Sequence, residues 1–203
     1  MKVLGFIGTG SLASYFVEGL ARAGADLKIM VSPRNAQKAA DLQHRYGVTV
    51  AENQQIADEA ELVVISLLPI DAPSVLRGLR FRQGQTLLSV MSGSRLEAMR
   101  SLAEPAEVAL SMMPGLANAH NVGPSVLYPD HHVARELLEK LGPVHAFQSE
   151  AQFIAASVMG AFSGMTTLMM QDVMNWFEHQ GLEPGAARQL VAEVVKGNAT
   201  ALL

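Results

Sequence analysis

Gly8-Thr9-Gly10-Ser11-Leu12-Ala13 is the stretch that decides the fold of this chain. It follows the apolar run of residues 2–7 (KVLGFI) and opens a helical pattern over residues 11–23. A strand, a G-x-G-x-x-A turn and a helix in this order are the fingerprint of a dinucleotide-binding loop. The glycines permit a tight turn and close approach to a pyrophosphate, and the helix N-terminus attracts phosphate. The alternative is a glycine turn without a ligand.

Short apolar runs alternate with helical patterns over the rest of the first 150 residues. Strands are expected at residues 27–31, 48–50, 62–68, 86–91, 108–112, 126–128 and 144–147, and helices at 35–46, 54–60 and 131–141. The run of residues 62–68 (LVVISLL) lacks regular polar alternation, which is typical of a central parallel strand buried on both faces. The pattern predicts an α/β fold, a Rossmann-type doubly wound parallel sheet.

The carboxyl-terminal quarter has a different texture. Residues 115–124 read as a small polar loop, and from residue 152 onward the chain is helical with one break at 181–185. We therefore expect a Rossmann domain at residues 1–150 and an all-helical domain for dimerisation and substrate binding at residues 151–203. The last helix stops without a polar cap, so either a partner subunit covers it or the chain is truncated.

Composition excludes several classes of protein. The 203 residues are 49% hydrophobic and 17% charged, with a net charge of -4, so a basic nucleic-acid surface is not expected. The chain has no cysteine, which excludes disulfides and thiolate metal sites, and its histidines suggest no other metal site. No uninterrupted apolar stretch approaches the ~20 residues of a membrane span. We expect a soluble, cytoplasmic protein.

The end of the second strand indicates which dinucleotide is bound. NAD-binding sites usually carry a carboxylate there, whereas this chain has Val31-Ser32-Pro33-Arg34-Asn35. A hydroxyl and a guanidinium suit a 2′-phosphate, so the sequence favours NADP(H). The alternative makes Ser32 and Arg34 part of a solvated helix start that Asn35 caps.

Several segments together resemble a known family. They are residues 5–10 (GFIGTG), 31–35, 46–48 (YGV), Asn53, the strand ending at Pro69, residues 113–114, 141–144 (LGPV) and 181–182. On these residues the chain resembles the pyrroline-5-carboxylate reductases, within the wider group of NADP oxidoreductases that includes coenzyme F420-dependent enzymes. The resemblance implies that the glycine loop and Ser-x-Arg-Asn hold NADP(H), and that Asn53 reaches the adenosine ribose. The expected cofactor contacts are Gly8, Thr9, Gly10, Ser11, Leu12, Ala13, Ser32, Pro33, Arg34, Asn53, Leu67, Leu68, Pro69, Met91, Ser92, Met113 and Pro114.

The substrate half departs from the family pattern. Residues 115–117 (GLA) replace the family's Asn-Thr-Pro, and residues 159–165 (MGAFSGM) replace its Ser-Gly-Ser-Gly-Pro-Ala-Tyr. Leu68 stands where the family has lysine, and the family's Gly-Gly-Thr-Thr segment has no counterpart. Pyrroline-5-carboxylate and another imine or carbonyl therefore both remain candidate substrates, with proline biosynthesis as the family's setting.

Three side chains are candidate catalytic groups. Ser163 and Thr166 lie early in the long helix, where they would donate a hydrogen bond near the nicotinamide; the alternative is a bond within the helix. His120 follows Met113-Pro114 and is either a pocket residue or a surface histidine. Methionines and the Gly160/Gly164 pair on that helix suggest a homodimer through the C-terminal helices.

The sequence thus predicts an NADP(H)-dependent reductase that transfers hydride to a small imine or carbonyl. Two alternatives are an F420-dependent NADP reductase and a β-hydroxyacid dehydrogenase, but the latter needs a lysine on the interdomain helix, and Lys196 lies too far along the chain. A third alternative is an NADP-binding sensor without catalysis.

Overall fold

The computed structural model describes residues 1–113 and 115–203. In these residues one sheet contains β1 (Val3–Ile7), β2 (Lys28–Val31), β3 (Thr49–Val50), β4 (Leu62–Ile65), β5 (Thr86–Ser89), β6 (Glu107–Met112), β7 (Ser125–Tyr128) and β8 (Val144–Ala146). The helices are α1 (Ser11–Arg22), α2 (Ala36–Tyr46), α3 (Asn53–Glu59), α4 (Ala72–Leu76), α5 (Leu96–Ala103), α6 (Leu116–Ala119), α7 (His132–Glu139), α8 (Glu150–Ala156), α9 (Met159–His179) and α10 (Pro184–Ala201).

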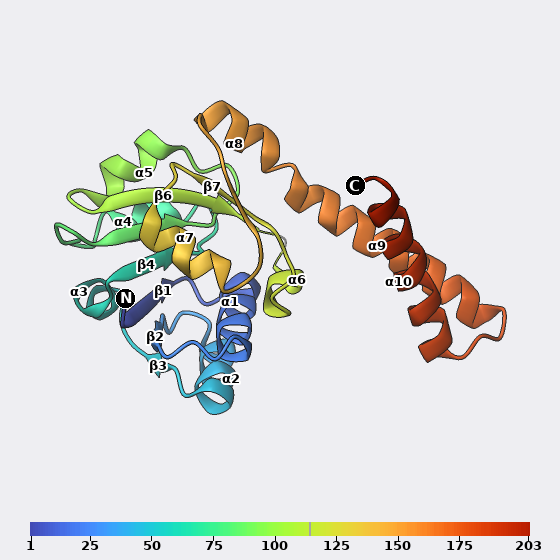
Figure 1. Cartoon of the computed structure of the whole chain (residues 1–203). Coiled ribbons are helices and arrows are strands. Elements are labelled where there is room, and N and C mark those ends of the chain that lie inside the picture. Colours follow the sequence, from blue (N-terminus) through green and yellow to red (C-terminus); the bar gives the residue numbers. More distant parts are fainter. Residues whose placement is uncertain (114) are drawn as a thin grey trace. The chain divides into compact units, whose positions relative to one another are not determined.

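The strand order is β3-β2-β1-β4-β5-β6-β7-β8 (Figure 1). The strands from β3 to β6 are parallel, so their carboxyl ends share one edge of the sheet. The chain moves outward from β1 in one direction to β2 and β3, then returns to β4 on the other side of β1. This reversal makes a topological switch point, the usual place for a ligand in an open α/β sheet. The predicted Rossmann-type fold is confirmed.

Helices cover both faces of the sheet because side chains alternate along each buried strand. Leu4 and Phe6 of β1 join the cluster that packs under α1, α2 and α7. Gly5 faces the other side, where a Cβ atom would lie 2.3 Å from Cγ2 of Ile56 on α3. Glycine at this position therefore allows α3 to pack directly on the central strand.

Three local features differ from the expectations. β4 ends at Ile65, three residues earlier than expected, and Leu68 beyond it is 66% exposed. The expected loop at residues 115–124 contains the one-turn helix α6, because the buried Asn118 side chain accepts from Gly115 N–H and donates to the Gly123 carbonyl. β7 pairs antiparallel with β6, so the sheet is mixed at one end.

The chain divides into two compact units, residues 1–158 and 159–203. The sequence placed the boundary at residue 150, before α8. Within the first unit, however, Phe153 of α8 is 4% exposed and stacks on Tyr128 of β7, with ring centroids 6.4 Å apart. This aromatic contact explains why α8 belongs with the sheet.

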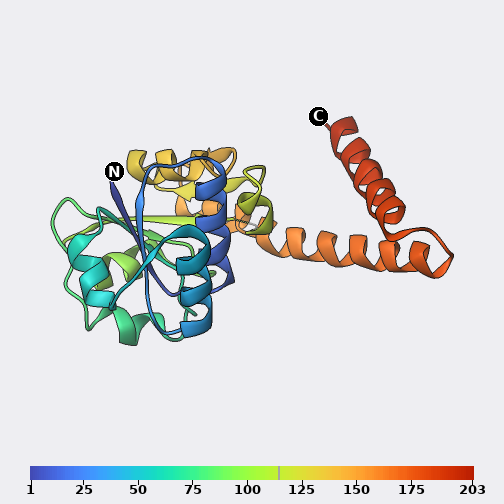
Figure 2. The ribbon, with the colours of Figure 1, turned by 90° about the horizontal axis from the view of Figure 1, so that it is seen from below.

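The second unit is the hairpin of α9 and α10 (Figure 2). None of the residues of α9, all of which the structure describes, is buried. Taken as one helix, residues 150–179 are long and apolar enough to cross a membrane, by length and composition alone. The sequence expectation concerned uninterrupted apolar stretches; in this segment glycine, serine and threonine interrupt the apolar run without adding charge.

Candidate functional site

A cavity of about 430 Å³ opens at the switch point between the carboxyl ends of β1 and β4. Three segments meet there: the glycine loop after β1, the start of α2, and the chain leaving β4. The residues that line the cavity are Gly8, Thr9, Gly10, Arg34, Asn35, Ala36, Ser66, Leu67, Leu68 and Asp71.

The glycine loop is held from both sides by hydrogen bonds, which are buried on the β2 side. The Ser32 hydroxyl accepts a bond of 2.9 Å from Gly8 N–H, and Thr9 Oγ1 donates to the Ser32 carbonyl at 2.6 Å. On the other side, the hydroxyl of Ser66, just after β4, donates to the Gly8 carbonyl. Only glycine fits at residue 8, because φ is +102° and a Cβ atom would lie 2.5 Å from the Ser66 carbonyl oxygen.

Gly10 leaves the start of α1 open. A Cβ atom there would meet nothing within 4 Å in the described part of the chain, so the cradle has room for a ligand beside the backbone. The first turn of α1 contains no acidic residue. Free N–H groups and the helix dipole make this end favourable for a phosphate group, and the fully buried Ala13 lets α1 pack closely on the sheet. The loop therefore fits a dinucleotide pyrophosphate.

Two cationic side chains lie near the glycine loop: Arg34, which lines the cavity, and Lys38 of α2. The guanidinium of Arg34 donates to Oδ2 of Asp71 at 2.7 Å. The ammonium of Lys38 donates to the Ser11 hydroxyl at 3.0 Å, at the start of α1. An arginine and a lysine next to a glycine loop suit a ligand with more than one phosphate group.

Comparison with known proteins gives a consistent result. Residues 3–93 match the family described as NADP oxidoreductase, coenzyme F420-dependent. The chain is 28% identical over 215 residues to pyrroline-5-carboxylate reductase 1 of Bacillus spizizenii, which covers 100% of this chain and 72% of the relative. The chain is similar to the pyrroline-5-carboxylate reductases over its whole length.

Solved reductases share its fold. The pyrroline-5-carboxylate reductase of Streptococcus pyogenes matches with a TM-score of 0.83 at 18% identity, covering 98% of this chain and 79% of that one. The Plasmodium falciparum pyrroline carboxylate reductase, solved with NADP bound, matches with a TM-score of 0.82 at 17% identity over 98% and 78% of the two chains.

The remaining expected cofactor residues lie in varied surroundings. Met91 and Met113 are buried at 7% and 4% exposure, so their side chains face the core. Asn53 is the first residue of α3, and its side-chain Oδ1 is buried without a hydrogen-bond partner among the described residues. Leu12 and Pro33 are half-buried, while Ser11, Pro69 and Ser92 are exposed; Pro114 lies outside the described residues.

In the first unit, the candidate catalytic residue His120 lies away from the glycine loop. His120 is exposed at the end of α6, where the neighbouring Ala119 carbonyl accepts from Arg22 in the last turn of α1. That is the opposite end of α1 from Gly10. In the second unit, Thr166 donates to the Phe162 carbonyl within α9, as the alternative interpretation has it, and Ser163 is half-buried.

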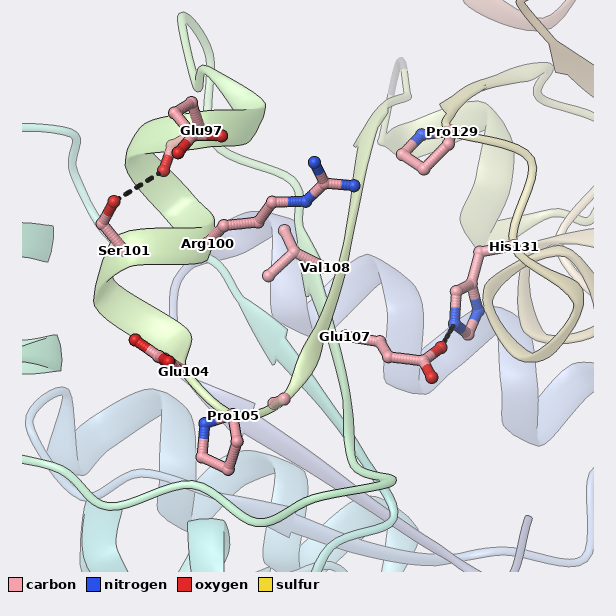
Figure 3. A pocket seen from close by; sticks show the side chains of 10 residues that line it. Glu97, Arg100, Ser101, Glu104, Pro105, Glu107, Val108, Pro129 and His131 are labelled. Carbon is pink, nitrogen blue, oxygen red and sulfur yellow. Dashed lines mark hydrogen bonds and ion pairs between the residues drawn. The ribbon is translucent and has the colours of Figure 1, made fainter.

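A larger cavity, about 630 Å³, lies at the amino end of β6, lined there by Glu107 and Val108 (Figure 3). Glu107 at the start of β6 pairs with His131 there, with 2.8 Å between Oε2 and Nε2, and Arg100 of α5 lines the same cavity. Nearby, Arg135 donates two hydrogen bonds to Asp130 and so lowers the pKa of that carboxyl. Because glycine loops sit at carboxyl ends of strands, this cavity is separate from the dinucleotide cleft.

Sequence reasoning missed Asp71, which lines the cavity, and Lys38, which donates to Ser11 at the start of α1. Lys38 carried a signal, since it follows Arg34 by four residues at the start of a helix. Asp71 carried none, because its partner Arg34 is 37 residues away. The expectation that Ser32 contacts the phosphate stays a prediction; in the structure Ser32 is 2% exposed and its hydroxyl accepts from Gly8 N–H.

Proposed function

We propose that this chain is an NADP(H)-dependent reductase that transfers hydride to a small imine or carbonyl substrate. The observation that carries the proposal is the open, hydrogen-bonded glycine loop with Arg34 and Lys38 beside it. The segment after β2 supplies no carboxylate for a ribose 2′-hydroxyl, which argues against NAD(H).

The relatives support the reaction class. The curated relative is named a pyrroline-5-carboxylate reductase, and one structural match was solved with NADP bound. A cyclic imine with a carboxylate is therefore the first substrate to test. Other small imines and carbonyls come next, because the substrate segments of this chain differ from the family pattern.

The residues of the chain have distinct tasks in this proposal. The start of α1 holds the pyrophosphate, and Arg34 holds the 2′-phosphate. Leu67 and Leu68 provide an apolar wall of the cleft that excludes water from it. The bound cofactor supplies the hydride. Ser163 and Thr166 are proposed hydrogen-bond donors to the acceptor, and His120 is a third candidate donor.

A binding titration followed by turnover tests the proposal. NADPH and NADH are titrated by nicotinamide fluorescence, and oxidation of NADPH is then followed by absorbance with cyclic imines and small carbonyls. We expect tighter binding of NADPH and its oxidation with at least one imine. Preference for NADH would contradict the cofactor assignment. NADPH binding without turnover of any substrate would instead identify a binding protein without catalysis.

Arg34 is the residue whose replacement tests the cofactor assignment most directly. The Arg34→Ala variant is expected to weaken NADPH binding about tenfold or more and to leave NADH binding nearly unchanged. Arg45→Ala, which removes an exposed arginine on α2, serves as the control with no expected effect. Equal losses for NADPH and NADH would contradict a contact with the 2′-phosphate.

We also propose that the second unit forms a homodimer. Phe162, Met165, Met169 and Trp176 follow one stripe of α9 and are each at least 60% exposed. An apolar stripe of this length needs a cover, and a second copy offers the same stripe in a self-complementary arrangement. Sulfur-containing side chains adapt well to such contacts.

Light scattering after gel filtration tests the dimer. A mass of two chains is expected for the parent protein and for Gln171→Lys, which alters the opposite side of α9. Met165→Lys is expected to give one chain. A monomeric parent protein that floats with lipid vesicles would favour a membrane role for residues 150–179 instead. We further propose a cytoplasmic location, which cell fractionation tests.

A further inference from the structure

The cavity contains one charge that does not suit an anionic ligand. Among the described lining residues, Asp71 is the carboxylate, and it accepts the bond of 2.7 Å from Arg34. The Asp71 side chain is 29% exposed and that of Arg34 is 68% exposed. The two residues belong to different segments, the chain after β4 and the chain after β2, which flank the glycine loop.

The Asp71 backbone is fixed in place. Its carbonyl accepts from the Ser74 hydroxyl at 2.8 Å and from Val75 N–H at 3.2 Å at the start of α4. The carboxylate is therefore presented to the cleft by an anchored residue, while Arg34 is a long, flexible side chain. When a second anion competes for the guanidinium, Arg34 is the partner that moves.

The competing anion would be the 2′-phosphate of NADP(H). Phosphate and carboxylate both accept paired hydrogen bonds from a guanidinium, so they compete for the same donors. Like charges a few ångströms apart also repel each other. NAD(H) lacks the 2′-phosphate and meets neither effect. The pyrophosphate, common to both dinucleotides, lies at the start of α1, where Lys38 bonds Ser11.

We propose that Asp71 reduces the preference of the cleft for NADP(H) over NAD(H). Its carboxylate holds Arg34 in the free protein and is exchanged for the 2′-phosphate when NADP(H) binds. Asp71 thereby weakens NADP(H) binding and leaves NAD(H) binding unchanged, so it narrows the preference that Arg34 creates. This inference rests on the proposed function.

Binding measurements without turnover test the exchange. The Asp71→Asn variant keeps the size of the side chain and its acceptor oxygen but removes the charge. We expect about fivefold tighter binding of NADPH and of adenosine 2′,5′-bisphosphate, and NADH binding within about twofold of the parent. The gain in NADPH affinity is expected to shrink at high salt, because salt screens exposed charges.

A matched control comes from a second aspartate–arginine pair. Asp41 pairs with Arg45 at 3.3 Å on α2, so Asp41→Asn removes the same charge outside the cavity lining. It is expected to leave all affinities unchanged. Thermal unfolding followed by circular dichroism checks that both variants are folded, since exposed ion pairs contribute little to stability.

The outcomes distinguish failure of the Asp71 exchange from failure of the proposed function. Tighter NADPH binding by Asp71→Asn, with NADH unchanged, supports the exchange. Unchanged or weaker NADPH binding overturns it, and so does an equal gain for NADPH and NADH, which would be a general charge effect. If the parent protein binds neither NADPH nor the bisphosphate, the proposed function fails and the inference with it.

Discussion

Replacement of Ser32 by alanine removes the hydroxyl that holds the glycine loop to the end of β2. In the structure this hydroxyl accepts from Gly8 N–H at 2.9 Å, and Thr9 Oγ1 lies 3.1 Å from it. Gly8 and Thr9 are buried, and Ser32 itself is 2% exposed, so water does not readily replace the lost acceptor. The variant leaves one buried N–H group without a partner.

The magnitude follows from that single group. An unsatisfied buried donor costs about 1–3 kcal/mol, so we expect the free energy of unfolding to fall by this amount. A typical domain has about 5–15 kcal/mol of stability, so the variant should still fold. In the proposed function the loop also binds the pyrophosphate, which NADPH and NADH share. Both affinities are therefore expected to fall together, by about tenfold if about 1.4 kcal/mol of the loss appears in binding.

Urea unfolding and fluorescence titration with both dinucleotides provide the assay. Ser101→Ala is the control, since this exposed hydroxyl donates only to the Glu97 carbonyl within α5. Its effect should stay below about 0.5 kcal/mol. A loss of NADPH affinity alone, with NADH binding and stability unchanged, would refute the reasoning. It would show that Ser32 contacts the 2′-phosphate.

Three further predictions concern stability. Gly8→Ala forces a Cβ atom to 2.5 Å from a carbonyl oxygen at a φ of +102°, so we expect a loss above about 2 kcal/mol in urea unfolding and no NADPH binding by fluorescence. Gly19→Ala places a Cβ atom 2.5 Å from the Asn118 carbonyl oxygen and is expected to lower stability by about 1–3 kcal/mol while NADPH affinity persists, because it lies far from the glycine loop. Asp130 has a lowered pKa in the folded protein because Arg135 donates to it, so its stabilisation is present at neutral pH and is lost as the pH falls through that lowered value. Asp130→Asn should therefore cost about 0.5 kcal/mol at pH 7 and nothing in acid, as urea unfolding at both pH values would reveal.

The sequence predicted the alternation of strands and helices well because burial is encoded locally. Residues 62–65 are apolar without interruption, and all four are buried in β4. The direction of β7 was harder to predict, because residues 125–128 indicate a strand but not its direction. Its antiparallel pairing with β6 depends on the path of the chain between the two strands. The turn of α6 depends on one buried side chain, Asn118, whose bonds are invisible in a hydropathy pattern.

The sequence predicted most residue types of the candidate site, but it did not predict which way their side chains point. The glycine loop could be recognised because the spacing of its glycines is what permits the tight turn and the approach of a phosphate group. Ser32 and Arg34 were chosen as polar groups suited to phosphate, yet a sequence does not say which way each side chain turns. The structure has Ser32 buried and Arg34 exposed. Asp71 joins the site through a contact between distant segments, which no local pattern encodes.

The hairpin of α9 and α10 has a consequence for how this protein is handled. Of its residues, all described by the structure, Ala187 and Val191 of α10 are the buried ones. So small an interior cannot offset the conformational entropy of ordering two long helices. If a second copy supplies the missing cover, folding of this unit and association become one equilibrium. Dilution would then unfold this unit by dissociating the dimer, and the melting temperature of the unit would rise with protein concentration.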